Sequence, residues 1–169
     1  MNSLSLCFAF FFSLVNSVPD GRELFLLHVE QASALTAISI PRTRYFATLI
    51  AWDSQAASTE ELFQVARVLL DAGCVYFCCW GPGCERLHDA IDEEYSVGGV
   101  KVDQDESTIM TTWHSDETAE EAAWFLLHSA FPDDRFFSEC RATVAVCIGG
   151  KVLSEQMRAA ILAAATNEG

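Results

Sequence analysis

Residues 74–95 read CVYFCCWGPGCERLHDAIDEEY, and this stretch decides the fold. It opens with a continuous apolar run, Cys74–Trp80, that has the length and composition of a strand covered on both faces of its sheet. Gly81-Pro82-Gly83 then predicts a tight turn. A helix is predicted to follow from Cys84, because Leu87 and Ile91 recur at the spacing of one helical face. Strand, turn and helix together form the repeating unit of an α/β protein.

The same alternation continues on the N-terminal side of this unit. Tyr45–Trp52 is a second apolar run of strand length. Ser58 and Glu61 then have the spacing of a capping box, which predicts the start of an amphipathic helix that stops at Gly73. Further upstream, Glu23–Val29 is a candidate for a short strand.

On the C-terminal side, strands are predicted over 107–113 and 142–148. A helix is expected to begin among acidic residues near Asp116 and to bury Trp124 and Phe125. A last, alanine-rich helix is expected over 154–165. The whole pattern predicts a three-layer α/β sandwich, Rossmann-like or flavodoxin-like, with a mainly parallel sheet of about four to five strands.

The length of 169 residues suits one such domain, which we place at 45–169, behind an N-terminal segment at 18–44. Residues 1–17 carry no charge and contain an apolar run, as a signal peptide does, although no basic residue precedes the run. The alternatives are a non-native extension from a start site placed too far upstream, or a buried strand or helix. The apolar run is too short to span a bilayer, so no stable membrane association is expected for the mature chain.

The chain carries 24 acidic and 10 basic residues, for a net charge of −14. This surface repels phosphate backbones, so nucleic acid is not an expected partner. A protein partner, basic where it makes contact, or a cation site remains open. Most of the cysteines lie in apolar strand-like runs, where cysteine behaves as a small buried hydrophobe, and this favours a cytoplasmic protein over an exported one.

Three predicted strands end in a tryptophan followed by a polar or turn residue: Trp52-Asp53, Trp80-Gly81 and Trp113-His114. Parallel strands end at one edge of their sheet, and ligands of such folds bind there. Candidate catalytic residues at this edge are Cys84, His88, His114 and Asp53. A cysteine at a helix N-terminus with a nearby base and an acid could form a nucleophilic site.

Two other interpretations of the same residues stay open. Cys84 could be a buried or capping cysteine, and Cys84, His88 and His114 with Asp53 or Asp92 could bind zinc, although their spacing matches no recognised zinc motif. The sequence contains no Walker loop, no GxGxxG after a strand and no GxSxG, so it names no cofactor and no hydrolase-type nucleophile elbow.

Two segments also carry a resemblance to a known family. WGxxC at Trp80–Cys84 and TTWH at Thr111–His114, with the acidic residues around them, resemble a family of small bacterial proteins known only as a domain of unknown function. The resemblance covers roughly Tyr45–Phe131 and implies a bacterial, single-domain α/β protein without a known activity.

Because the strand ends hold no complete catalytic set, the leading prediction is a non-enzymatic regulatory or protein-interaction module. The alternative is a small hydrolase or transferase that uses Cys84 with His88 or His114, with or without a metal.

Overall fold

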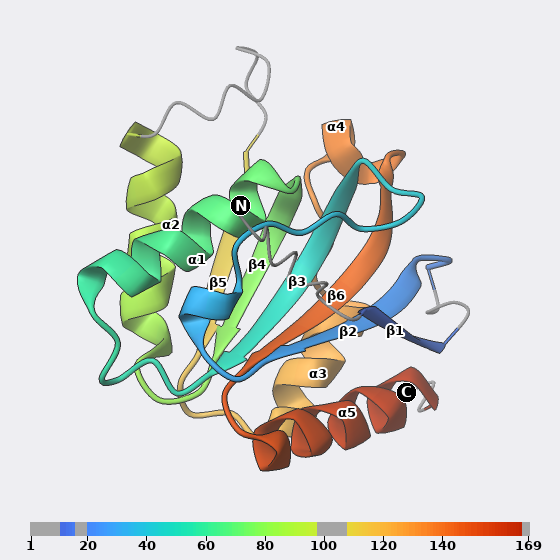
Figure 1. Ribbon diagram of the computed structural model, residues 1–169. Helices are drawn as coiled ribbons and strands as arrows, with labels where there is room; N and C mark the ends of the chain where they lie inside the picture. The colour runs from blue at the N-terminus through green and yellow to red at the C-terminus, as the bar shows by residue number, and fades with distance from the viewer. Residues whose placement is uncertain (1–10, 16–19, 98–107, 167–169) are drawn as a thin grey trace, which may run out of the picture.

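The computed structural model describes residues 11–15, 20–97 and 108–166, and these form an α/β fold around a six-stranded sheet (Figure 1). The strand order is β1-β2-β6-β3-β4-β5. The strands are β1 (Phe11–Val15), β2 (Glu23–Val29), β3 (Tyr45–Trp52), β4 (Cys74–Trp80), β5 (Met110–His114) and β6 (Cys140–Ile148). Only β1 is antiparallel to its neighbour, so the predicted α/β class with a mainly parallel sheet is confirmed.

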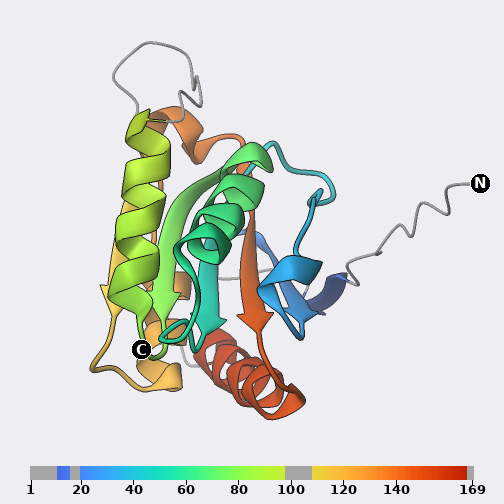
Figure 2. The same ribbon diagram turned by 60° about the vertical axis from the view of Figure 1, so that its left-hand side comes forward.

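Helices cover both faces of this sheet (Figures 1 and 2). Helices α1 (Thr59–Asp71) and α2 (Cys84–Val97) pack with the short 3-10 helix η1 (Ala32–Ala34) on one face. Helices α3 (Ala119–His128) and α5 (Lys151–Thr166) pack on the other, and α4 (Asp134–Phe137) precedes β6. Because successive strand residues point to opposite faces, Ile50 enters the first core while Leu49 and Ala51 enter the second.

The strongest local patterns predicted their elements correctly. The side chain of Ser58 accepts a hydrogen bond from the backbone N–H of Glu61, whose carboxylate accepts one in return from the backbone of Ser58, and α1 begins there. Helix α3 begins in the same way at Thr118 with Glu121, a second capping box that the expected start near Asp116 overlooked.

Two sequence-based expectations near the C-terminal half are wrong. The strand expected over 107–113 is Met110–His114, so His114 is the last residue of β5 and pairs with Trp80 instead of lying in the next turn. Trp124, expected in the core, is 45% exposed, because it lies on the side of α3 that faces away from the sheet. Phe125 packs partly buried against the core.

Glu23–Val29, which the sequence placed in a segment ahead of the domain, is a central strand of this sheet. It lies between β1 and β6 and pairs with β6 along its whole length. Of the expected leader at 1–17, the structure describes only Phe11–Val15, which form β1. The polar excursion at 96–106 lies, from residue 98 onward, outside the described residues.

The five parallel strands end at one edge of the sheet, toward the bottom of Figure 1. After β3 the chain crosses one face to form α1, whereas after β6 it crosses the other face to form α5. Because β3 and β6 are neighbours, their following loops diverge there. Such a topological switch point is where ligands of open α/β sheets bind.

Candidate functional site

The Gly81-Pro82-Gly83 turn, around which the sequence is organised, is packed against the loop that follows β3. A Cβ atom on Gly81 would lie 2.5 Å from the backbone oxygen of Trp52, and one on Gly83 would lie 2.7 Å from the backbone nitrogen of Gln55. Both glycines have positive φ angles, 110° and 78°. The backbone N–H of Ser54 donates to the oxygen of Pro82 over 2.9 Å. The two glycines therefore serve the close approach of two loops.

Arg86, which the sequence analysis did not single out, closes this junction. Its guanidinium donates to the backbone oxygens of Ser54, Gln55 and Ala57 over 3.0–3.1 Å. These carbonyls lie in the loop before α1, so one side chain of α2 holds the start of the neighbouring helix. An arginine three residues after a glycine-rich turn has no distinctive pattern, and only the tertiary structure assigns it this role.

Cys84, the proposed nucleophile, begins α2 but faces the core between α2 and the sheet. It is 2% exposed and packs in the same cluster as Cys79 and Leu87. Burial raises the pKa of the Cys84 thiol, and hydrogen bonds from the backbone of His114 and from the helix N-terminus offset this only in part. A raised pKa works against the thiolate that a nucleophile requires.

His88 lies one turn further along α2 and faces β5 on the α1–α2 side of the sheet. Its Nε2 is 3.1 Å from the hydroxyl of Thr111, and its Nδ1 is 3.1 Å from a carboxylate oxygen of Asp89. Thr111 also donates to Asp92 over 2.7 Å. The ring of Trp113, itself 48% exposed, packs edge-on to the imidazole at 4.6 Å. His88 therefore ties α2 to the edge strand.

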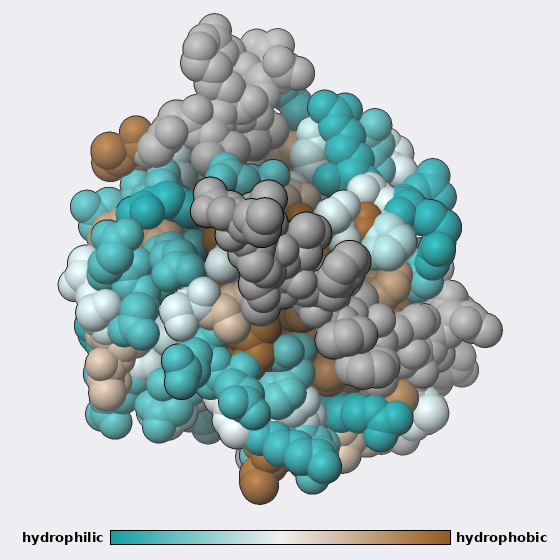
Figure 3. Space-filling model, viewed as in Figure 1, coloured by the Kyte–Doolittle hydropathy of each residue, from teal (hydrophilic) through white to brown (hydrophobic). Residues whose placement is uncertain are grey.

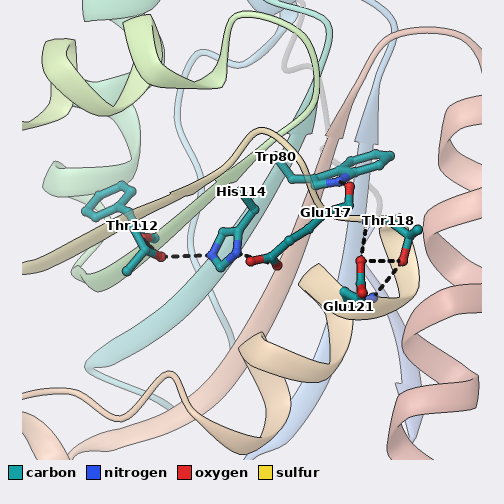
Figure 4. Close-up of polar contacts among 7 residues, drawn as sticks. Trp80, Thr112, His114, Glu117, Thr118 and Glu121 are labelled. Carbon is teal, nitrogen blue, oxygen red and sulfur yellow. Dashed lines mark hydrogen bonds and ion pairs between the residues drawn. The ribbon is translucent and has the colours of Figure 1, made fainter.

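His114 lies on the opposite side of β5, in the middle of a hydrogen-bonded chain that runs from Thr112 to Glu117, just before α3 (Figure 4). Its Nδ1 is 2.7 Å from a carboxylate oxygen of Glu117, and its Nε2 is 3.0 Å from the hydroxyl of Thr112. Thr112 can also donate to the backbone oxygen of Phe77 over 3.3 Å. The indole N–H of Trp80 donates to the backbone oxygen of Glu117 over 2.9 Å.

The order of hydroxyl, imidazole and carboxylate in this chain is that of a nucleophilic triad. Here, however, His114 is buried, with both ring nitrogens engaged and its ring against Phe125 at 4.7 Å between centroids. In this setting the imidazole holds the end of β5 to Glu117, the residue before the N-cap of α3. Thr112 and Glu117, its two partners, were not among the residues predicted for the site.

The sheet therefore separates the histidines that the sequence analysis grouped together. His88 faces α2, His114 faces α3, and Cys84 points into the core on the α2 side. Among the described residues, no group of three or more histidine, cysteine, aspartate or glutamate side chains is arranged to hold a metal ion. The zinc interpretation of this set has no geometric support, because residues on opposite faces of a strand point apart.

Asp53 is exposed in the loop after β3, beside the switch point. It lines an acidic hollow of about 270 Å³ together with Glu30 and Glu61. The carboxylate of Asp53 accepts a hydrogen bond from the backbone N–H of Gln55 over 3.3 Å, and that of Glu61 caps α1. Two of these three acids thus have structural partners within their own loop or helix, and Cys84 does not line this hollow.

A second hollow, of about 310 Å³, opens on the outer side of α3. Its walls are Glu117, Glu121, Trp124 and Phe125, and we call it the α3 hollow. Glu117 is held by His114, and Glu121 is held by the backbone and side chain of Thr118 (Figure 4). Trp124 stacks on His128, with ring centroids 4.8 Å apart and planes 22° from parallel. The hollow thus combines two fixed carboxylates with two aromatic rings.

The model of a protein family described as a domain of unknown function, DUF7684, matches residues 24–164 of this chain. The chain belongs to this family. The match runs from β2 into α5, so the DUF7684 domain includes every parallel strand of the sheet. It confirms the resemblance to a family known only as a domain of unknown function.

No curated protein and no solved structure matches this member of the DUF7684 family. Within the described part of the chain, no helix has both the length and the apolar character needed to cross a membrane.

Proposed function

We propose that this domain is a protein-interaction module that receives an arginine or lysine side chain of its partner in the α3 hollow. The observation that carries the proposal is the pairing of two carboxylates with exposed aromatic surface in one hollow, lined by Glu117, Glu121, Trp124 and Phe125. A cation attracts carboxylates by charge and aromatic faces by their quadrupole, so both halves of this lining favour the same kind of group.

The carboxylates of the hollow are held in position before any partner arrives. Glu117 is fixed by His114 yet keeps 41% of its side chain exposed. Glu121 is fixed by the capping box and is also exposed. Preorganised groups lose little side-chain entropy on binding, which strengthens the contact they can make.

The surface around the hollow also suits a basic partner. A net charge of −14 steers positively charged molecules toward the domain and raises their association rate. On the opposite side of the sheet from α3, the face over α1 and α2 is largely hydrophilic (Figure 3). Exposed tryptophans such as Trp124 are frequent anchors of protein interfaces.

The test uses a capped pentapeptide with a central arginine among alanines, titrated into the ¹⁵N-labelled domain. We expect saturable shifts of the indole N–H of Trp124 and of the amides of Glu117 and Glu121. Trp124→Ala should weaken binding by about threefold to thirtyfold, the range that cation–π contacts support. A lysine peptide tests whether the hollow distinguishes the two cations.

The matched controls change the charge of the peptide and the position of the tryptophan. A citrulline peptide keeps the shape of arginine without its charge and should not bind. Trp113→Ala removes a comparably exposed tryptophan on the other face of the sheet and should leave binding unchanged. Equal binding of the arginine and citrulline peptides, or equal loss in both tryptophan variants, would contradict the proposal.

The second candidate is a small hydrolase or transferase that uses Cys84 with His88 or His114. Its support is the place of Cys84 at the start of α2, next to the backbone of His114. Burial, which raises the thiol pKa, opposes it. We expect iodoacetamide to label Cys84 of the native protein at pH 7.5 at least about tenfold more slowly than in urea. Labelling of native Cys84 at the unfolded rate or faster, mapped by mass spectrometry, would favour this enzyme instead.

A further inference from the structure

A different pocket lies at the other end of the sheet, where β2 and β6 begin. It encloses about 390 Å³, a volume within the usual range for small-molecule sites. Glu23 pairs with Ala142, so Arg22, the residue before β2, lies level with Arg141, the second residue of β6. Its walls include Asp20, Arg22, Pro132, Phe137, Ser138 and Arg141. We call it the basal pocket.

Arg22 is the unusual residue of this pocket, because a guanidinium with only 4% exposure must satisfy its donors within the protein. Its Nε donates to the carboxylate of Asp20 over 2.5 Å, and its Nη1 donates to the backbone oxygen of Ala130 over 3.2 Å. Its Nη2 is buried and has no hydrogen-bond partner among the described residues, and the thiol of Cys140, a weak acceptor, lies beside the guanidinium. A charged donor left unpaired in this way costs free energy that an acceptor in the pocket would recover.

The other unpaired polar atom lies nearby on the same face of the sheet. Thr143 Oγ1 and Arg22 Nη2 are the two buried side-chain polar atoms without a partner in the described part of the chain. Thr143 pairs with Leu24, which follows Arg22 by two residues. Because side chains alternate along a strand, Arg22 and Thr143 both point to the face that α3 and α5 cover. The two buried unpaired polar atoms of the described residues therefore lie near the beginning of β2 and β6.

The charges of the pocket favour an anion with a single charge. Arg22 and Arg141 contribute two positive charges and Asp20 contributes a negative charge, which leaves an excess of about one positive charge. Asp20 would repel the second charge of a phosphate dianion. The guanidinium of Arg22 also lies 5.9 Å from the ring centroid of Phe131, which adds apolar surface behind it.

The rest of the lining favours an apolar body next to the charged group. Pro132 and Phe137 supply apolar walls, and Phe137 keeps its ring largely exposed at the rim. Arg141 is exposed, and its Nε donates to the backbone oxygen of Ser138 over 3.0 Å. Its remaining guanidinium donors can meet an anion that enters the pocket.

We propose that the basal pocket binds a small organic monocarboxylate. The carboxylate pairs with Arg141 and accepts a hydrogen bond from Arg22 Nη2 once a shift of the Arg22 side chain exposes this buried atom, while the apolar part of the ligand packs on Phe137 and Pro132. The basal pocket lies at the opposite edge of the sheet from the α3 hollow, and the two share no lining residue. A result that rejects one proposal therefore leaves the other unaffected.

The experiment is a titration of the ¹⁵N-labelled domain with benzoate, with benzamide as the uncharged counterpart and inorganic phosphate as the competing anion. Benzoate should shift the amides of Gly21, Ser138 and Arg141 saturably, and benzamide and phosphate should not. Arg141→Gln should weaken benzoate binding about tenfold, as expected for loss of a charge-assisted contact. Arg158→Gln makes the same change at an exposed position of α5 and should leave binding unchanged.

Arg141 is chosen for substitution because it is exposed, whereas loss of the buried Arg22 would also leave Asp20 without its partner. The proposal would be overturned by equal shifts with benzoate and benzamide, by an unchanged benzoate affinity in Arg141→Gln, or by a preference for phosphate at the same amides. The last result would assign the pocket to phosphoryl groups. The absence of any saturable shift with benzoate at millimolar concentration would likewise reject it.

Discussion

At the scale of single residues, the conspicuous features of the sequence turn out to serve packing. Gly81 and Gly83 are glycines because the backbone of the loop after β3 occupies the space of their side chains. Cys84 faces the core, and the guanidinium of Arg86 donates hydrogen bonds to backbone carbonyls of the neighbouring loop. The surface of the α3 hollow is formed instead by ordinary glutamates and aromatic residues of a helix.

The close packing of the Gly81-Pro82-Gly83 turn predicts a large difference between two glycine-to-alanine substitutions. Gly81→Ala should lower the free energy of unfolding by about 1–3 kcal/mol, because the added Cβ meets the oxygen of Trp52 and φ is positive. Gly150→Ala adds a Cβ with no atom within 4 Å and should change stability by less than about 1 kcal/mol. Urea unfolding of the two variants measures this, and equal losses would refute the packing role of the turn.

At the scale of elements, the predictable ones were those with a complete local pattern. Strands β3 and β4 and helix α1 have uninterrupted apolar runs or a capping box, and their bounds match the expectation. The predicted bounds of the edge strand β5 were wrong, because a strand that pairs with a single neighbour is less buried and has a weak apolar pattern. Its bounds are set by pairing with β4, which ends at Trp80 opposite His114.

At the scale of the whole molecule, buried thiols link stability to pH. Burial raises the pKa of Cys78 and Cys147 to about 12, and it also raises the pKa of Cys74 and Cys79. An unfolded cysteine has a pKa of about 8.5. Below that pH both states keep their thiol protons, and this part of the stability is fully present. Above it the unfolded state ionises first, so stability falls as pH rises toward the folded values.

We therefore expect the urea midpoint of the reduced protein to fall steadily between pH 8 and pH 10.5. Cys147→Ala removes one of the buried thiols and should flatten this dependence, even though the smaller side chain also lowers stability at pH 7.5. A midpoint that is constant or rises over this range, or a slope that Cys147→Ala leaves unchanged, would show that the thiols do not control it.

By itself, the sequence determined the α/β class, most elements and the edge at which the strands end, because these follow from apolar runs, caps and turns within a few residues. The tertiary structure alone decided which side chains meet. His88 and His114 lie on opposite sides of the sheet, although both follow strand ends at the same edge in the sequence pattern. Arg22 and Arg141, far apart along the chain, meet at one pocket. The physical reason is that strand alternation assigns each side chain to a face, and only the pairing of distant strands decides what lies there.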